Sequence, residues 1–321
     1  MNGKLPSLKW LNTFRSVAHC GSLKRAAEQN RQSISTVSQQ LQCLEAHLGV
    51  ALLDHSCRPM VVTTQGAVYL RFAEQVLGLV EQAHSEVTAH TTSTLRHLRF
   101  AMIEDFESDI APEITHILAG ALPNCRLTHF TRVSREILDL LQNRQVDIGI
   151  ATQPQSPLPD VSEYPLLRDP FVLAVPANST ATSEDCIEDR SGLPFLRYSS
   201  SQIMGSMIEA QLSRLRIPLE SSFELDSTSS IMALIARNGG WAITTPCNFA
   251  RAARFHGQVR LLPFPRKGFA RTISMFVAGQ HLNDVAQLIS ATLRSRISAR
   301  TIVPTVDQYP WLTDGFHLTS E

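Results

Sequence analysis

The sequence predicts an α + α/β protein, with a helical N-terminal part, one long helix and two C-terminal α/β lobes. Apolar residues recur at spacings of three and four along residues 8–93, which is the period of amphipathic helices, and one short β-branched segment interrupts them. From residue 97 onward, strand-like and helix-like runs alternate, as they do in α/β folds. These runs are too many for one compact sheet, so we expect two lobes.

Three short helices and a hairpin are expected within residues 1–65. Gly21 ends the first helix, Ser22 is the expected N-cap of the second, and Gly49 ends the third, whose leucines form one buried stripe. The predicted ranges are Leu8–Ala18, Leu23–Glu28 and Ile34–Leu48 for the helices and Ala51–Thr64 for the hairpin. This order of elements is a winged helix-turn-helix pattern.

A long linker helix is expected over residues 66–94. Its apolar positions alternate at spacings of three and four, and they are Leu70, Ala73, Leu77, Val80, His84 and Val87. A seam this long is more than a lone surface helix needs, so it indicates packing against a second copy of the chain.

The α/β part is expected over residues 95–300, with a mainly parallel sheet. Strands are predicted at Leu98–Ile103, Arg126–Thr131, Val146–Ala151, Phe171–Val175, Phe195–Tyr198, Phe223–Leu225, Trp241–Thr244, Val259–Leu262 and Ile273–Val277. Helices are predicted at Ile110–Leu122, Ile137–Leu141, Ile203–Leu215, Ile231–Ala236 and Val285–Ile297. Lobe 1 is assigned to about 95–163 and 268–300, and lobe 2 to about 164–267. Pro304, Pro310 and Gly315 argue against a regular element in the tail, 301–321.

Composition limits the classes of function. The 321 residues have no formal net charge, but residues 1–65 carry seven Lys and Arg against three Asp and Glu, a balance of +4 that points weakly to a polyanionic partner. The six cysteines contain no CxxC pair, so neither a disulfide framework nor a metal site is expected, and no cofactor is expected either. No secretion signal or membrane-length apolar run is recognisable, which indicates the cytoplasm.

The third helix carries a candidate DNA-reading face. Opposite the leucine stripe lie Ser35, Gln39 and Gln42, with Ser38 on the flank. Glutamine can form two hydrogen bonds with adenine, and serine can bond a phosphate or a base edge. Arg58 on the hairpin could enter the minor groove. From spacing alone, an ordinary solvated helix face is an equal alternative.

A family resemblance favours DNA reading. The ordered runs are Gly21-Ser22-Leu23, Ala26-Ala27, Ser35-Thr36-Val37-Ser38-Gln39-Gln40-Leu41, Leu44-Glu45, Leu48-Gly49, Leu52-Leu53, Thr63-Thr64 and Gly66. In order and spacing they resemble the N-terminal domain of LysR-type transcriptional regulators. The resemblance implies a dimerisation helix after the wing and a two-lobed effector domain like periplasmic solute-binding proteins. It places contacts with bases or phosphates at Ser33, Ile34, Ser35, Ser38, Gln39 and Arg58.

Two positions depart from the family pattern. Ile34 stands where members usually have glutamine, and it is either part of the buried stripe or exposed against a thymine methyl group. Asn30 stands where members usually have a buried leucine, which leaves the register of the turn at Asn30 and Arg31 open.

The resemblance continues more faintly into the effector domain, through Leu122-Pro123-Asn124, Gln145–Ile150 and Asn238–Pro246. It implies an effector cleft lined by Ile103, Glu104, Asp105, Thr131, Ser199, Ser200, Ser201, Thr244 and Thr245. Glu104 and Asp105 would suit an effector with a cationic group, or they would cap the next helix. The serines are expected to cap the helix that starts near Gln202, with or without binding the effector.

The predicted function is a sequence-specific, DNA-binding transcriptional regulator that a small molecule controls. The expected partners are double-stranded promoter DNA, the effector and further copies of the chain in a homodimer or homotetramer, with RNA polymerase as a further candidate. A redox-responsive regulator of the same fold is the alternative, although Cys186 and Cys247 are far apart in sequence. A solute-binding protein is disfavoured by the helix-turn-helix, and an enzyme by the lack of any catalytic motif.

Overall fold

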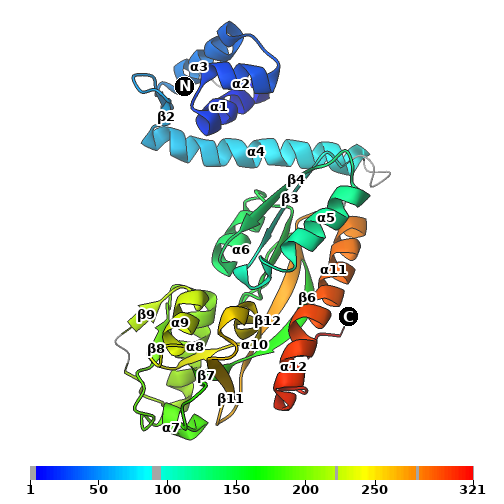
Figure 1. Ribbon diagram of the computed structural model, residues 1–321. Helices are drawn as coiled ribbons and strands as arrows, with labels where there is room; N and C mark the ends of the chain where they lie inside the picture. Colours follow the sequence, from blue (N-terminus) through cyan, green and yellow to red (C-terminus); the bar gives the residue numbers. More distant parts are fainter. Residues whose placement is uncertain (1–4, 89–94, 221–222, 280–281, 321) are drawn as a thin grey trace. The chain divides into compact units, whose positions relative to one another are not determined.

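The computed structural model describes residues 5–88, 95–220, 223–279 and 282–320. The chain divides into two compact units, one made mainly of residues 1–89 and the other of the residues that follow. Each unit has a hydrophobic core of its own. We describe the two units separately (Figure 1).

The first unit is a winged helix-turn-helix followed by a long helix. Its elements are α1 (Leu8–Cys20), α2 (Leu23–Asn30), α3 (Ile34–Leu48), β1 (Leu53–Asp54), β2 (Val61–Val62) and α4 (Thr64–Thr88). The β1–β2 hairpin is antiparallel. The predicted stop at Gly21, the cap at Ser22 and the stop at Gly49 are confirmed, and both glycines adopt the left-handed conformation. Helix α4 starts at Thr64, two residues before the position expected from sequence.

The apolar positions of α4 serve two different surfaces. Ala73 and Leu77, which the sequence placed in a seam against another copy, are buried in the core of their own unit. A second stripe is exposed, and it consists of Val68, Phe72, Val76 and Leu79. The side chains of His84 and Val87 lie outside the described residues. The expectation was therefore wrong for Ala73 and Leu77, because these two side chains hold α4 against the other helices of its own unit.

The second unit contains two lobes, each built on its own sheet (Figure 1). Lobe 1 has six strands in the order β13-β6-β12-β5-β3-β4. They are β3 (His97–Met102), β4 (Arg126–Thr131), β5 (Ile148–Thr152), β6 (Ser162–Pro170), β12 (Ala270–Val277) and β13 (His317–Leu318). Helix α6 (Ser134–Gln142) packs on one face of this sheet, and α5 (Ala111–Ala121) and α11 (Asn283–Ile297) lie on the other.

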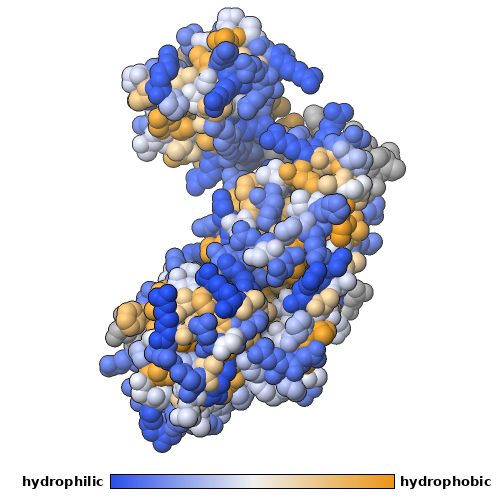
Figure 2. Space-filling model, in the orientation of Figure 1, coloured by the Kyte–Doolittle hydropathy of each residue, from blue (hydrophilic) through white to orange (hydrophobic). Residues whose placement is uncertain are grey.

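Lobe 2 has an antiparallel sheet, β10-β7-β11, and a parallel pair, β8-β9, which a bridge between Phe195 and Trp241 joins to it. The strands are β7 (Val172–Pro176), β8 (Leu196–Tyr198), β9 (Phe223–Leu225), β10 (Ala242–Thr244) and β11 (Val259–Pro263). Its helices are α7 (Ser183–Ile187), α8 (Ile203–Leu215), α9 (Thr228–Ile235) and α10 (Pro246–Arg251). The visible face of the second unit is largely hydrophilic, with small apolar groups scattered over it (Figure 2).

The expectation of mainly parallel sheets is wrong. In lobe 1 only β3 runs parallel to its neighbours β4 and β5, while β12 and β6 pair antiparallel. Strand β6 was not predicted from the sequence. Because it runs to Pro170, lobe 1 extends beyond the boundary that was expected at 163/164. The sequence did not predict this strand because it contains Pro165 and Pro170, and proline is uncommon inside strands. The β6–β12 register shifts beside the first of them: Leu167 faces Ile273 and Pro165 faces Ser274, so Leu166 is an extra residue in β6.

Two crossover points form the hinge between the lobes. The chain passes from β6 to β7 at Phe171 and returns between β11 and β12 through Phe269. The two rings stack with centroids 4.1 Å apart, and the Phe171 N–H donates to the Phe269 carbonyl at 2.9 Å. The crossovers are therefore held side by side.

The C-terminal tail is structured, contrary to expectation. It contains a π-helical turn (Ser298–Ile302), α12 (Val303–Gln308), a 3-10 turn (Pro310–Leu312) and β13. Its side chains Leu312 and Phe316 are buried, and β13 extends the lobe 1 sheet beside β6. The prolines lie in the first turns of their helices, where the missing N–H has no role. The tail is thus part of the core of the second unit.

Candidate DNA-binding surface and effector cleft

Helix α3 separates a buried face from a polar, exposed one. Val37, Leu41 and Leu44 are buried in the core of the first unit. The predicted DNA-reading side chains Ser35, Gln39 and Gln42 are exposed, and Ser38 is half-buried. Ser33 is the N-cap, and its hydroxyl accepts from the Thr36 N–H at 3.1 Å. The face chosen from sequence is therefore accessible along the whole helix.

Ile34 is not a core residue. It is the first residue of α3, and 49% of its surface is exposed. The interpretation as part of the buried stripe is therefore wrong. The buried stripe begins only at Val37, since no described residue of this unit buries the Ile34 side chain.

Hydrogen bonds from backbone N–H groups of the wing hold it against the helices. The Glu45 carboxylate on α3 accepts from the Leu52 N–H at 2.8 Å and from the Leu53 N–H at 3.2 Å. The Met60 N–H donates to the Gly21 carbonyl at 2.9 Å. Arg58 lies between these anchors, is exposed, and has no partner among the described side chains. Its guanidinium is free to meet a polyanion.

Asn30 ends α2 and makes polar contacts with α1. Its side-chain oxygen accepts from the Ser16 hydroxyl at 3.1 Å and from the Asn12 amide at 3.5 Å. Its own amide nitrogen is buried and has no hydrogen-bond partner among the described residues. The following Arg31 adopts the left-handed conformation and ends the helix. The turn is thus intact, although one polar group at its start is unsatisfied.

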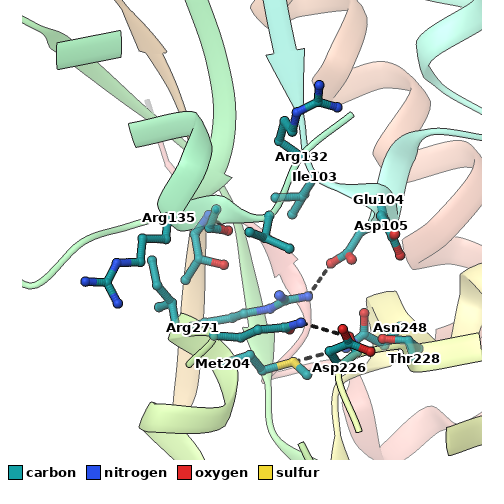
Figure 3. A pocket seen from close by; sticks show the side chains of 15 residues that line it. Ile103, Glu104, Asp105, Arg132, Arg135, Met204, Asp226, Thr228, Asn248 and Arg271 are labelled. Carbon is teal, nitrogen blue, oxygen red and sulfur yellow. Dashed lines mark hydrogen bonds and ion pairs between the residues drawn. The ribbon is translucent and has the colours of Figure 1, made fainter. Parts of the chain in front are cut away.

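The two lobes of the second unit face an open cleft of about 600 Å³ (Figure 3). Three of the residues predicted from sequence line it, namely Ile103, Glu104 and Asp105. The other lining residues are Arg132, Val133, Ser134, Arg135, Thr152, Gln202, Ile203, Met204, Asp226, Thr228, Asn248 and Arg271. The first turns of α6 and α8 both reach the cleft, and no side chain caps the start of α8.

The other predicted cleft residues lie outside it. Thr131, Ser199, Ser200, Ser201, Thr244 and Thr245 do not line the cleft. Thr244 is buried and shares a hydrogen bond of 3.1 Å with the Tyr198 hydroxyl. Thr245 is buried too, and its hydroxyl caps α10. The three serines form a turn before α8, whose N-cap is Gln202, so the expected serine cap is wrong.

The expectation that Glu104 and Asp105 cap the next helix is wrong. Both lie in a 3-10 turn (Glu104–Phe106), and the next helix, α5, begins without a side-chain cap. Instead, Glu104 pairs with Arg251 at 2.8 Å, and Asp105 pairs with Arg271. Both carboxylates are thus paired with arginine, so these two residues give less support to a cationic effector, which stays a prediction.

Arg271 is the centre of a buried polar network at the base of the cleft. Its guanidinium donates to Asp105, to Asp169 at 2.8 Å and to the Thr245 hydroxyl at 3.2 Å. Asp169 also accepts from the Cys247 N–H at 3.2 Å. The network joins β6 and β12 of lobe 1 to the start of α10 in lobe 2.

Ionisation in this network reflects burial and charge together. Burial raises the pKa of Asp169, and the neighbouring Arg271 opposes that shift. Burial alone would lower the pKa of Arg271, but the carboxylates of Asp105 and Asp169 more than offset it, so the pKa is raised and the guanidinium stays charged. The sequence signal that could have found Arg271 is a lone charge inside an otherwise apolar strand, since such a charge must be paired.

Two domain families match the chain. Residues 8–67 match the bacterial regulatory helix-turn-helix protein, lysR family, and residues 92–298 match the LysR substrate binding domain. Together they span most of the sequence. The chain belongs to the LysR family of transcriptional regulators. It therefore has a helix-turn-helix DNA-binding domain and an effector-binding domain, as the sequence predicted.

Relatives of this LysR-family regulator are transcriptional regulators as well. It is 24% identical to the HTH-type transcriptional regulator BbuR of Bordetella bronchiseptica, over 90% of this chain and 89% of that one. It is 27% identical to BenM of Acinetobacter baylyi over 44% of this chain and 46% of that one. Its fold matches full-length OxyR from Pseudomonas aeruginosa with a TM-score of 0.67 and 19% identity, covering 91% and 95% of the two chains.

The two buried thiols of the regulator, those of Cys186 and Cys247, are expected to stay protonated and therefore unreactive. Burial raises the pKa of the Cys186 thiol to about 11 and that of Cys247 well above its ordinary value. A thiol attacks an oxidant only as thiolate, so these two groups do not favour the redox alternative.

Within the described residues, no group of three or more His, Cys, Asp or Glu side chains could hold a metal ion. Every helix in the same residues is too short or too polar to cross a bilayer.

Proposed function

We propose that this LysR-family regulator reads promoter DNA in the cytoplasm with the exposed face of α3 and the wing. The reading residues are Ser33, Ile34, Ser35, Ser38, Gln39 and Gln42 on α3 and Arg58 on the wing. The observation that carries this proposal is the exposure of that face opposite the buried side chains of Val37, Leu41 and Leu44. A helix of this kind enters the major groove, while an arginine beside it meets the backbone or the minor groove.

The regulator acts as a dimer or a higher oligomer through α4. The exposed stripe Val68, Phe72, Val76 and Leu79 supports this, because four apolar side chains along one face of a helix are seldom left in water. Two reading heads joined in this way would recognise a palindromic site, with half-sites about one helical turn apart or a multiple of it. RNA polymerase is a further partner of such a complex at a promoter.

The cleft takes a small effector with an anionic group. Both carboxylates of the 3-10 turn are paired, whereas Arg135 in the first turn of α6 has no partner among the described residues. The free N–H groups at the start of α6 and α8 add partial positive charge to the same space. A ligand there changes the arrangement of the oligomer only by binding one arrangement more tightly than the other.

Selection of bound sequences from random duplex DNA tests the reading of DNA. The full-length protein is expected to enrich one palindromic sequence at moderate salt, and adding metabolite pools is expected to change its affinity or footprint. A protein that shows no preference for any duplex, with or without these pools, contradicts the proposal.

A matched series of small carboxylates, carboxamides and amines tests the charge of the effector. We expect only carboxylates to raise the melting temperature of the full chain. Stabilisation by the amines alone would contradict the anionic class and leave the DNA proposal unaffected.

A further inference from the structure

We infer that Ile34 makes this regulator selective for a thymine, by contact with the 5-methyl group in the major groove. The inference rests on the proposed function, since it assigns a chemical partner to one residue of the DNA-reading face. It concerns a single position of each half-site.

The first step is the position of Ile34. It is the first residue of α3, directly after the N-cap Ser33. Helix-turn-helix proteins present the N-terminal residues of the recognition helix to the base edges. Gln42, by contrast, lies more than two turns further along the helix. Ile34 is therefore at the end of α3 that approaches the bases.

The second step is what surrounds Ile34. The Ser33 hydroxyl bonds the Ser35 hydroxyl and the Thr36 hydroxyl, each at 2.8 Å, and caps the Thr36 N–H. These three hydroxyls satisfy one another, whereas the Ile34 side chain is 49% exposed. The group that projects from the start of α3 without a partner is thus an apolar one.

The third step is the chemistry of the groove. Among the four bases, only thymine presents an apolar group, its 5-methyl, at the major-groove edge. Ile34 against that methyl would remove apolar surface of both partners from water. Against any other base it would cover a donor or acceptor and leave it without a hydrogen bond. The β-branched side chain also has one strongly preferred rotamer in a helix, so little rotamer freedom is lost on contact.

The test removes only the methyl group. In the selected binding site of the full-length protein, each thymine of one half-site is replaced in turn by deoxyuridine, which pairs identically but lacks the 5-methyl. We expect the wild-type protein to bind roughly fourfold more weakly at one position, the value of one buried methyl group. The Ile34→Ala variant is expected to be indifferent to deoxyuridine at that position and unchanged at the others.

Two further variants separate this effect from general damage. Val50 follows the far end of α3 and is similarly exposed, at 43%, so Val50→Ala is expected to keep the wild-type response to deoxyuridine. Ile34→Val keeps the β-branch, and this variant is expected to retain part of the wild-type response to deoxyuridine.

The outcomes distinguish the inference from the proposed function. If the wild-type protein binds its site but tolerates deoxyuridine at every position, the inference is overturned and DNA reading stands. An equal response in wild type and Ile34→Ala would overturn it as well, since another residue would then contact the methyl. If no duplex is preferred at all, the proposed function fails first.

Discussion

The hydroxyl of Tyr309 accepts a hydrogen bond of 3.2 Å from the backbone N–H of Leu261 in β11. Strand β11 is an edge strand of lobe 2, so this N–H has no strand partner on that side. The Tyr309 ring also contacts Phe249 of α10, with centroids 5.7 Å apart. A few residues later β13 joins the lobe 1 sheet, where the Arg168 guanidinium donates to the Gly315 carbonyl at 2.7 Å. The tail thus ties the two lobes together outside the hinge, and it lies beyond residue 298, where the matched family domain ends.

Tyr309→Phe is expected to loosen this tie without disturbing the ring contacts. The Leu261 N–H loses its acceptor, and a net hydrogen bond is worth about 1 kcal/mol. Amide exchange in 259–263 should therefore become roughly fivefold faster in hydrogen-exchange mass spectrometry. Tyr164→Phe is a matched control, because no described residue bonds that hydroxyl. Equal exchange in all three proteins would show that Tyr309 does not restrain β11.

Arg271→Met is expected to destabilise the effector domain strongly at neutral pH. The change leaves Asp105 and Asp169 without their countercharge, and breaking a buried ion pair costs about 3–5 kcal/mol. Urea unfolding of the full chain measures this loss. Arg190→Met removes exposed ion pairs with Glu188 and Asp185, and it should change stability by no more than about 1 kcal/mol.

The loss in Arg271→Met is expected to depend on pH. Without the opposing arginine charge, the pKa of Asp169 in the folded protein rises further above its ordinary value of 3.8. An acid whose folded-state pKa is raised adds stability below its ordinary pKa and loses it as the pH rises through the folded-state value. The variant should thus be closest to wild type near about pH 4 and furthest from it near about pH 7. A deficit that is constant over this range would contradict the burial of a charged Asp169.

Asn30→Leu is expected to stabilise the first unit. It removes a buried amide nitrogen to which no described residue bonds, and such an unsatisfied group costs about 1–3 kcal/mol. Ser16 keeps a bond to the Asn12 carbonyl at 3.0 Å, so little is lost in exchange. The unfolding midpoint of the full chain in urea should rise for Asn30→Leu and rise less for Asn30→Ala. A lower midpoint for both would mean that the contacts with α1 outweigh the unsatisfied amide.

Phe72→Glu is expected to disrupt the oligomer. Phe72 lies in the middle of the exposed stripe of α4, where a second copy would bury it and a carboxylate would be desolvated. Sedimentation velocity should show a shift toward monomer and a weaker affinity for the palindromic site. Val61→Glu places the same charge on the wing, on a side chain of similar exposure, and should leave the sedimentation unchanged. A stable oligomer in Phe72→Glu would move the interface elsewhere.

Gln39 and Arg58 are expected to contribute to DNA binding in different ways, Gln39 through the bases and Arg58 through the phosphate backbone. Gln39→Ala should reduce discrimination among sites by about 1–3 kcal/mol while sparing non-specific affinity, since glutamine reads base edges. Replacing Arg58 with Met should lower the salt slope of binding by about one unit, as for the loss of one phosphate contact. Equal losses of Gln39→Ala on all sequences, or an unchanged slope for Arg58→Met, would contradict these roles.

Local patterns were sufficient to predict the three short helices α1, α2 and α3 of the first unit. The serine caps, the terminating glycines and the leucine spacing of α3 act within a few residues, so the sequence displays them directly. They were not sufficient for α4, where one helix packs apolar residues on two different sides. The spacing of apolar residues alone does not show which stripe packs into the core of its own unit and which stays exposed.

The sequence alone predicted most helices and strands and the exposed polar face of α3 from short-range periodicity and capping, and its motifs pointed to the family, but it did not reveal β6 or the elements of the tail. Only the tertiary structure decided that Glu104 and Asp105 pair with arginines that follow them by more than a hundred residues, and that the tail closes the lobe 1 sheet. Partners so distant along the chain become neighbours only when both lobes have folded. The charge presented to an effector is therefore a property of the fold rather than of any local segment.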